Sequence, residues 1–187
     1  ALNLLFRMDL SSDSDLTNKL RDLALRLIDQ HAAQTLVPPL GASSGYWFGG
    51  GNLLQEDSGS LLLCGRYRNA GDARTGTGDG TRGLEFAIFR GSSGFSGSFT
   101  KIRSFSKSDL STDEAPVISI EGGCLLPGPE GHGWELFIST EKAAPYPKGL
   151  IHFQKPGTGV WSIDRISSSE TNPATLDAET LSSVFSS

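Results

Sequence analysis

From Tyr46 onward, the apolar residues of this chain come in short runs that are separated by glycine- and serine-rich turns. Runs of about four to eight residues bounded in this way are typical of β-strands. A first series covers residues 49–54, 60–67, 83–89 and 99–105, and a second covers 117–126, 134–139, 149–153 and 160–166. Two series at an offset of roughly 60–70 residues predict a repeated four-stranded antiparallel unit.

A repeat of this length and strand content is typical of the blades of a β-propeller. We therefore expect an all-β fold of about two such units, at about 46–110 and 111–166, with the tail 167–187 as the start of a third. Because propellers close with about four or more blades, three alternatives stay open. The chain is part of a longer propeller, it closes by associating with other copies, or its units are the two sheets of a sandwich.

The first 45 residues have a different pattern. Apolar residues at helical spacing, among them Leu16, Leu20 and Leu23, predict one amphipathic helix over about residues 15–33. The residues that follow, up to 45, read as a linker, so the domains are expected at 1–45 and 46–187. We expect the apolar stripe of the helix to pack on the β-domain, and a partner-binding helix is the alternative.

Composition and charge limit the classes of partner. The net charge of −5 gives no reason to expect nucleic acid or an anionic membrane as a partner, and no apolar run approaches the length of a membrane span. The first ten residues do not read as a signal peptide, which slightly favours a cytoplasmic location. Cys64 and Cys124 are expected to be buried free thiols, with a disulfide as the alternative. The histidines and cysteines show no metal-ligand spacing, so we expect neither a metal site nor a cofactor.

The strand at 117–126 carries the most informative residue. Glu121 is followed by two glycines, which let other groups approach closely. In a blade, the start of the first strand and the end of the second share a face. That rule gathers one set of polar residues at one opening: Arg66, Tyr67, Arg68, Asp72, Arg74, Arg82, Glu85, Glu121, Glu141 and Lys142.

Such an opening suits a polar ligand. Arginine side chains bind carboxylates, phosphates or vicinal hydroxyls, and a sugar ring stacks on the faces of aromatic residues. The aromatic candidates are Tyr46, Trp47, Phe48 and Trp134, with Trp47 the nearest to the cluster in sequence. The alternative is that Arg66 and Arg68 pair with Asp72 and Glu85 in a structural network.

Two short motifs and the repeat length carry a resemblance to a known family. The motifs are Ser119-Ile120-Glu121-Gly122-Gly123 and Gly65-Arg66-Tyr67-Arg68. Over about residues 46–166 the chain resembles the five-bladed propeller glycoside hydrolases related to families 43 and 32. The resemblance implies inner-strand carboxylates around an axial pocket, with Glu121 as the general acid and a second carboxylate as base or nucleophile.

The resemblance leaves the second carboxylate open. Where the family places its inner-strand aspartate, this chain has residues 49–52, Gly-Gly-Gly-Asn. Asp72 on the adjacent loop is the candidate substitute, and Asp177 is a remote one. The expected function is therefore hydrolysis of a glycosidic bond in an oligosaccharide or another polar small molecule. The alternatives are a non-catalytic sugar- or anion-binding fragment and a fragment that self-assembles into a homo-oligomer to complete the propeller.

Overall fold

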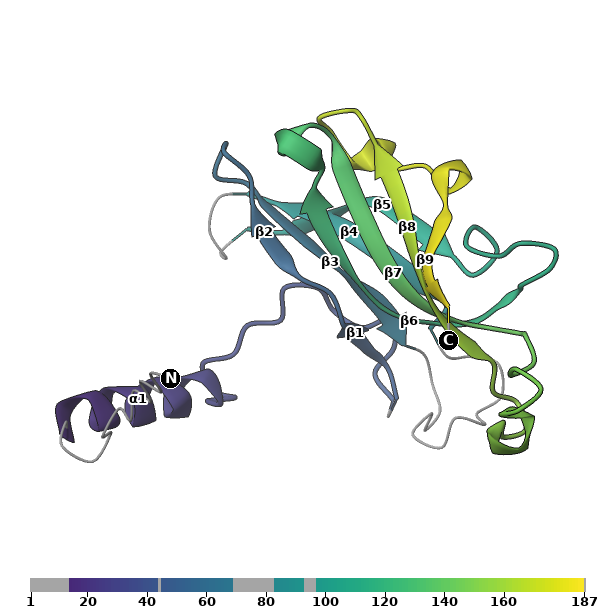
Figure 1. Cartoon of the computed structure of the whole chain (residues 1–187). Helices are drawn as coiled ribbons and strands as arrows, with labels where there is room; N and C mark the ends of the chain where they lie inside the picture. Colours follow the sequence, from purple (N-terminus) through teal and green to yellow (C-terminus); the bar gives the residue numbers. More distant parts are fainter. Residues whose placement is uncertain (1–13, 44, 69–82, 93–96, 187) are drawn as a thin grey trace, which may run out of the picture. The chain divides into compact units, whose positions relative to one another are not determined.

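The computed structural model describes residues 14–43, 45–68, 83–92 and 97–186 (Figure 1). The chain divides into two compact units, Ala1–Thr35 and Leu36–Ser187. Mostly antiparallel β-structure with one α-helix makes up the described part, as expected for the all-β class. Among the described residues, no helix has both the length and the hydropathy that crossing a lipid bilayer requires.

The first unit contains helix α1, Ser14–Leu27, which ends earlier than the expected residue 33. The reason lies in the residues that follow, where the Asp29 side chain accepts a hydrogen bond from the backbone N–H of His31 at 2.9 Å. Such a side-chain turn competes with helix continuation. No residue of α1 is buried, so the packing of its apolar stripe on the β-domain stays a prediction.

The first sheet of the second unit follows the predicted strands closely. It contains β1 (Trp47–Gly49), β2 (Leu53–Gln55), β3 (Leu61–Arg68), β4 (Glu85–Gly91) and β5 (Phe99–Ser106). The strand order is β1-β3-β4-β5, and β2 pairs with the other half of β3. The predicted continuous strand at 49–54 is therefore two short strands, and the chain leaves the ladder between them.

The second sheet contains β6 (Val117–Pro127), β7 (Trp134–Lys142), β8 (Val160–Ser168) and β9 (Ser182–Ser186), in that order. Its turns and crossing segments carry the short 3-10 helices η2 (Pro129–Gly131), η3 (Ile151–Phe153), η4 (Pro173–Thr175) and η5 (Ala178–Thr180). Figure 1 shows the two sheets with their long strands running alongside one another.

Two predictions about the second sheet were wrong. The expected strand at 149–153 is η3, because the backbone N–H groups of Leu150 and Phe153 are bonded locally, to Pro147 and Leu150. The fourth strand is instead β9, which pairs with β8. The tail 167–187 thus completes the second sheet and does not start a third unit.

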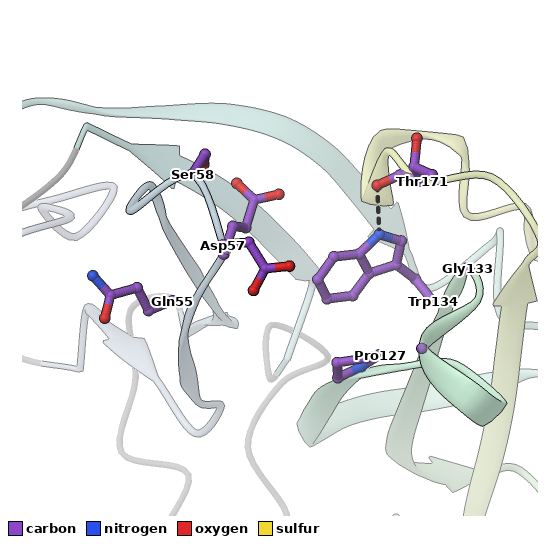
Figure 2. Close-up of a pocket in the computed structure, with 9 residues that line it drawn as sticks. Gln55, Asp57, Ser58, Pro127, Gly133, Trp134 and Thr171 are labelled. Atoms are coloured by element: carbon purple, nitrogen blue, oxygen red, sulfur yellow. Dashed lines mark hydrogen bonds between the residues drawn. The ribbon is translucent and has the colours of Figure 1, made fainter.

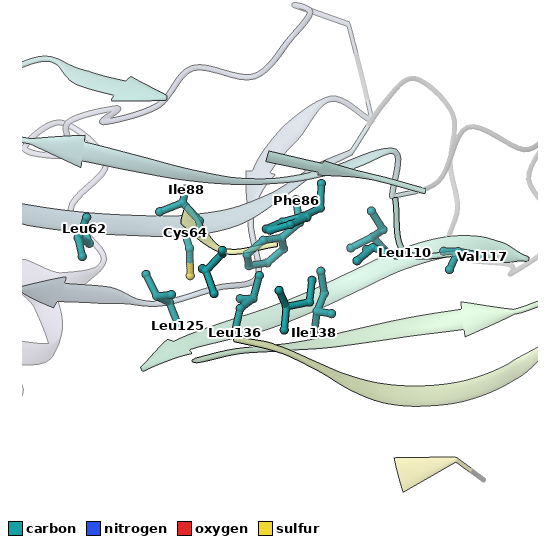
Figure 3. Packing of buried hydrophobic residues seen from close by; sticks show 13 residues of the cluster. Leu62, Cys64, Phe86, Ile88, Leu110, Val117, Leu125, Leu136 and Ile138 are labelled. Atoms are coloured by element: carbon teal, nitrogen blue, oxygen red, sulfur yellow. The ribbon is translucent and has the colours of Figure 1, made fainter. Parts of the chain in front are cut away.

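The main core lies between the two sheets (Figure 3). Alternate residues of β3, β4 and β7 point into it, as the pleat of a β-strand requires. Leu62, Cys64, Phe86 and Ile88 come from the first sheet, and Leu125, Leu136, Ile138 and Ile166 from the second. Both cysteines are free thiols, as expected, with Cys64 buried and Cys124 half-buried.

The outer faces of the two sheets differ. On the first sheet, a second cluster of Phe48, Tyr67, Ala87 and Phe89 is covered by Val37 from the segment before β1. On the second sheet, Trp161, Ile163 and Phe185 remain exposed, and Ile163 and Phe185 are direct neighbours across β8 and β9.

The first strands of the two sheets are joined by hydrogen bonds at the break between β1 and β2. The carbonyl of Gly50 accepts from the N–H of Gly123 at 3.0 Å. The Asn52 side chain donates to the carbonyl of Leu125 and accepts from its N–H, both at 2.9 Å. Asn52 thereby pairs with the β6 backbone as a neighbouring strand would, and this junction positions the site described next.

Candidate functional site

Glu121 sits at a β-bulge in the strand that borders this junction. The pairing register between β6 and β7 shifts between Ile120 and Gly122, so Glu121 is the extra residue of β6. A bulge bends its strand and redirects the side chain of the extra residue. Glycine is needed beside it, because a Cβ on Gly122 would lie 2.8 Å from the carbonyl oxygen of Gly50. The expectation that these glycines allow close approach is confirmed.

The Glu121 carboxylate is held by residues of both sheets. Arg66 of β3 donates from Nη1 to Oε2 of Glu121 at 2.7 Å and to the carbonyl of Ile120 at 2.9 Å. The Ser119 hydroxyl donates to Oε1 of Glu121 at 2.6 Å. The side chains of Arg66 and Glu121 keep 13% and 16% of their surface exposed, so the pair is partly open to solvent.

An aromatic ring completes this group. The guanidinium carbon of Arg66 lies 4.9 Å from the ring centroid of Trp47, which is a cation–π distance. We refer to Trp47, Arg66, Ser119 and Glu121 as the junction cluster. Arg68 is two residues beyond Arg66 on β3 and opposite Trp47 in β1, so it shares the face of Arg66. Among the predicted site residues, the structure therefore places Trp47, Arg66 and Arg68 on one face of the first sheet, where Arg66 meets Glu121 of the second sheet.

Tyr67 and Glu85 are not brought to Glu121. Tyr67 is buried on the outer face of the first sheet, where its ring packs against Phe48 and Phe89. Glu85 is opposite Tyr67 in the ladder and pairs with Lys101 at 2.6 Å. Burial in the first place, and the Glu85 charge in the second, raise the pKa of the Tyr67 phenol.

Glu141 and Lys142 point to opposite faces of the second sheet, because they are consecutive in β7. Glu141 is buried and accepts a hydrogen bond from the N–H of Gly159 at 2.7 Å, which anchors the start of β8. Lys142 pairs with Asp164 at 2.9 Å. Both contacts lie within the second sheet and its loop, so they fit structural roles better than ligand contacts.

Sequence reasoning missed Asp164. Its carboxylate is fully buried and accepts from Lys142, Ser162 and Thr140. A signal was present in the sequence, because Val160, Ser162, Asp164 and Ile166 alternate on one face of β8. Polar residues in phase with apolar ones in a strand predict a buried, paired charge.

Three predicted site residues, Asp72, Arg74 and Arg82, lie outside the described residues. The described chain resumes at Gly83, whose carbonyl accepts from the N–H of Ile120 at 3.0 Å. A Cβ on Gly83 would lie 2.0 Å from the carbonyl oxygen of Ile120, so this contact requires glycine. Over residues 14–43, 45–68, 83–92 and 97–186, no three His, Cys, Asp or Glu side chains form a group that could hold a metal ion.

A pocket of about 480 Å³ lies at the other end of the first strands (Figure 2). Its walls are the turn after β2, the end of β6 and the start of β7. The lining residues are Gln55, Glu56, Asp57, Ser58, Pro127, Gly131, Gly133, Trp134 and Thr171. The sequence offered Trp134 only as a stacking face for the opening near Glu121, so this pocket was not predicted.

Comparisons of the chain with protein-family models, with curated proteins and with solved structures found no match in any of the three.

Proposed function

We propose that the β-unit consists of two blades of a β-propeller and binds a carbohydrate, or a similarly polar ligand, at the junction cluster. Each sheet is an antiparallel meander of four strand positions in chain order, which supports the blade interpretation. The first strands lie against each other through Gly50, Asn52 and β6. Inner strands of a propeller have this neighbour relation, and their side chains border the axial opening.

The ion pair between Arg66 and Glu121 is the observation that carries the proposal. It links β3 of the first sheet to β6 of the second, is partly open to solvent and lies next to an indole ring. Guanidinium groups donate to hydroxyls and carboxylates, carboxylates accept from hydroxyls, and indole faces stack on the C–H face of a sugar ring. These groups together match a polar, ring-shaped ligand.

Glycoside hydrolysis with Glu121 as general acid is the second candidate, favoured by the partial exposure of Glu121 at a strand bulge. A general acid has to present an O–H to the leaving oxygen. Both oxygens of Glu121 accept hydrogen bonds from the protein, so acid catalysis requires Ser119 or Arg66 to release it on substrate binding. It also requires a second carboxylate, and Asp72 is the candidate. Binding without turnover needs neither change, and we rank it first.

The test measures both binding and product release with a panel of furanoside and pyranoside oligosaccharides. Wild type is compared with Glu121→Gln and with the matched control Glu114→Gln, which changes an exposed glutamate outside the cluster. Binding by wild type and by the control, weakened in Glu121→Gln and without product, supports the proposal. Product release that only Glu121→Gln abolishes establishes the hydrolase instead. If no sugar binds to wild type, the proposal is wrong.

Self-association into a closed ring of sheets is a third candidate, and the exposed outer face of the second sheet favours it. Trp161, Ile163 and Phe185 keep 47%, 39% and 58% of their surface exposed. Large apolar patches of this kind mark association surfaces. Light scattering on wild type and on Ile163→Lys tests it: an oligomer that dissociates in the variant supports self-association, and a monomeric wild type excludes it.

A further inference from the structure

We propose that the pocket bounded by Asp57 and Trp134 is a separate binding site for a single neutral sugar ring. It lies at the opposite end of the first strands from the junction cluster and shares no residue with it. Its volume of about 480 Å³ is within the usual range of small-molecule sites. The inference does not depend on the function proposed for the junction cluster.

One wall of the pocket is a fixed aromatic platform. Trp134 is half-buried at the start of β7, and its Nε1–H donates to the carbonyl of Thr171 at 2.8 Å. That bond uses the polar atom of the indole and holds the ring in place, as Figure 2 shows. An indole whose N–H is already bonded offers its face for stacking, which is how proteins contact the C–H surface of sugars.

The opposite wall supplies acceptors and donors for hydroxyl groups. Asp57 and Ser58 are exposed in the turn between β2 and β3, and Gln55 also lines the pocket. Within the part of the chain that the structure describes, the Asp57 carboxylate accepts no hydrogen bond, so its oxygens are available to a ligand. A carboxylate with two such oxygens accepts bonds from two neighbouring hydroxyls of one sugar.

The two walls are tied together before any ligand binds. Glu56 forms a two-point ion pair with Arg90, through Oε2–Nε at 3.1 Å and Oε1–Nη2 at 3.0 Å. Arg90 Nη2 also donates to Oδ1 of Asn172 at 3.5 Å, and Asn172 follows the residue that holds Trp134. A site held in its bound geometry loses less conformational entropy on binding.

The charges of the pocket select the class of ligand. Arg90 is engaged by Glu56, and Asp57 is negative, so the pocket repels anions such as phosphate or a uronate. A single available carboxylate is too few ligands for a hard cation such as Ca²⁺. A neutral ring with adjacent hydroxyls satisfies both the indole and the carboxylate.

The experiment is calorimetric titration of the full chain with a panel of methyl monosaccharides (glucose, galactose, mannose, xylose and N-acetylglucosamine), with choline and glucuronate as charged probes. We expect one or more neutral sugars to bind. Asp57→Asn and Trp134→Phe should each weaken binding about ten-fold or more, since each removes contacts made directly to the sugar. The matched controls are Asp113→Asn and Phe153→Leu, an exposed aspartate and an exposed aromatic residue outside both sites.

Asp57 is on an exposed turn, so Asp57→Asn keeps the proposal testable if Trp134→Phe destabilises the fold. Glu121→Gln separates the two sites: it leaves binding at this pocket unchanged, whereas it weakens binding at the junction cluster. The proposal is overturned if no neutral sugar binds, if choline or glucuronate binds instead, or if Asp57→Asn leaves the sugar affinity unchanged.

Discussion

Two ion pairs in this fold use the same chemistry in different surroundings. Arg66 and Glu121 join the two sheets at 2.7 Å and keep 13% and 16% of their side-chain surface exposed. Lys142 and Asp164 join β7 and β8 within one sheet at 2.9 Å; Lys142 is 12% exposed, much as Arg66 is, whereas Asp164 has no exposed surface, so the two pairs differ in their carboxylates. Ser162 and Thr140 also donate to the Asp164 carboxylate. The Glu121 carboxylate is therefore partly open to solvent, whereas the Asp164 carboxylate is fully enclosed by the protein.

This difference separates a structural charge from a candidate binding group. A buried ion pair pays a large desolvation cost, which its mutual attraction barely offsets, so its removal is felt mainly through the partner that is left alone. A pair at a solvent-accessible edge costs less to form and less to break. The predictions below test that contrast in order of decreasing effect.

The largest effect is expected for Asp164→Ala. The substitution leaves the Lys142 ammonium almost buried without its counter-charge and removes the acceptor of two hydroxyls. We expect the free energy of unfolding to fall by about 3–5 kcal/mol, measured by urea denaturation. The exposed control Asp113→Ala should change it by less than about 0.5 kcal/mol.

The double variant Lys142→Met, Asp164→Leu sharpens this result. Since it removes both charges and keeps the apolar volume, it should recover most of the stability that Asp164→Ala loses. A double variant that is no more stable than Asp164→Ala would mean that packing at this position, and not the lone charge, causes the loss.

The next effect concerns the uncharged link between the sheets. Asn52→Ala removes the partners of both the N–H and the carbonyl of Leu125, and also the acceptor for the Cys64 thiol. We expect a loss of about 2–3 kcal/mol in the free energy of unfolding, because half-buried backbone groups are left unbonded. A smaller loss in the free energy of unfolding than for Glu121→Gln would mean that the ion pair, and not Asn52, contributes more to the stability of this junction.

Much of this architecture follows from the sequence, and the exceptions have physical causes. Strands with a clear apolar run, such as β3, β4 and β6–β8, lie where these runs predict them. Residues 149–153 have the composition of a strand, but local backbone bonds satisfy that segment. The serine-rich β9 has little apolar signal, and its position depends on pairing with β8, which no local pattern reveals.

The site was predictable in part. A rule based on strand ends placed Arg66 and Glu121 together, and the structure confirms that they meet. The same rule added Tyr67, which is adjacent to Arg66 in sequence but points to the other face of β3. The position of a residue relative to the strand end shows how far along the sheet it lies. Whether its side chain points to one face or the other depends on the alternation of side chains along the strand. The Asp57–Trp134 pocket depends on contacts between distant turns, which the sequence does not encode locally.

A smaller effect is expected for Glu121→Gln. The amide keeps the shape of the side chain but removes the charge that Arg66 meets, so we expect a loss of about 1–2 kcal/mol in the free energy of unfolding. Because the pair is partly open to solvent, added salt should reduce this difference, whereas the difference for Asp164→Ala should hardly change. Urea denaturation at low and high ionic strength measures both. An equal salt dependence would remove the distinction between the two pairs.

The smallest effect distinguishes the two faces of β3, where Arg66 meets the junction and Tyr67 is buried behind it. The raised pKa of Tyr67 means that the folded protein favours the neutral phenol. Below the unfolded-state pKa of 10.0 the phenol is neutral in both states, so Tyr67 gives the free energy of unfolding no pH dependence there. Above it, the unfolded chain releases the proton first, so stability should fall with pH by at most about 1.4 kcal/mol per unit until the folded-state pKa is passed.

Tyr67→Phe removes that slope. Urea midpoints measured at intervals from pH 8 to about pH 11 should therefore fall less steeply for the variant than for wild type. The substitution leaves every other ionisable group in place, including Lys101 over the ring, so the difference between the curves reports the Tyr67 phenol. Parallel curves would mean that the Tyr67 phenol loses its proton as readily in the folded protein as in the unfolded chain. The outer face of β3 would then be as accessible to solvent as the face that carries Arg66.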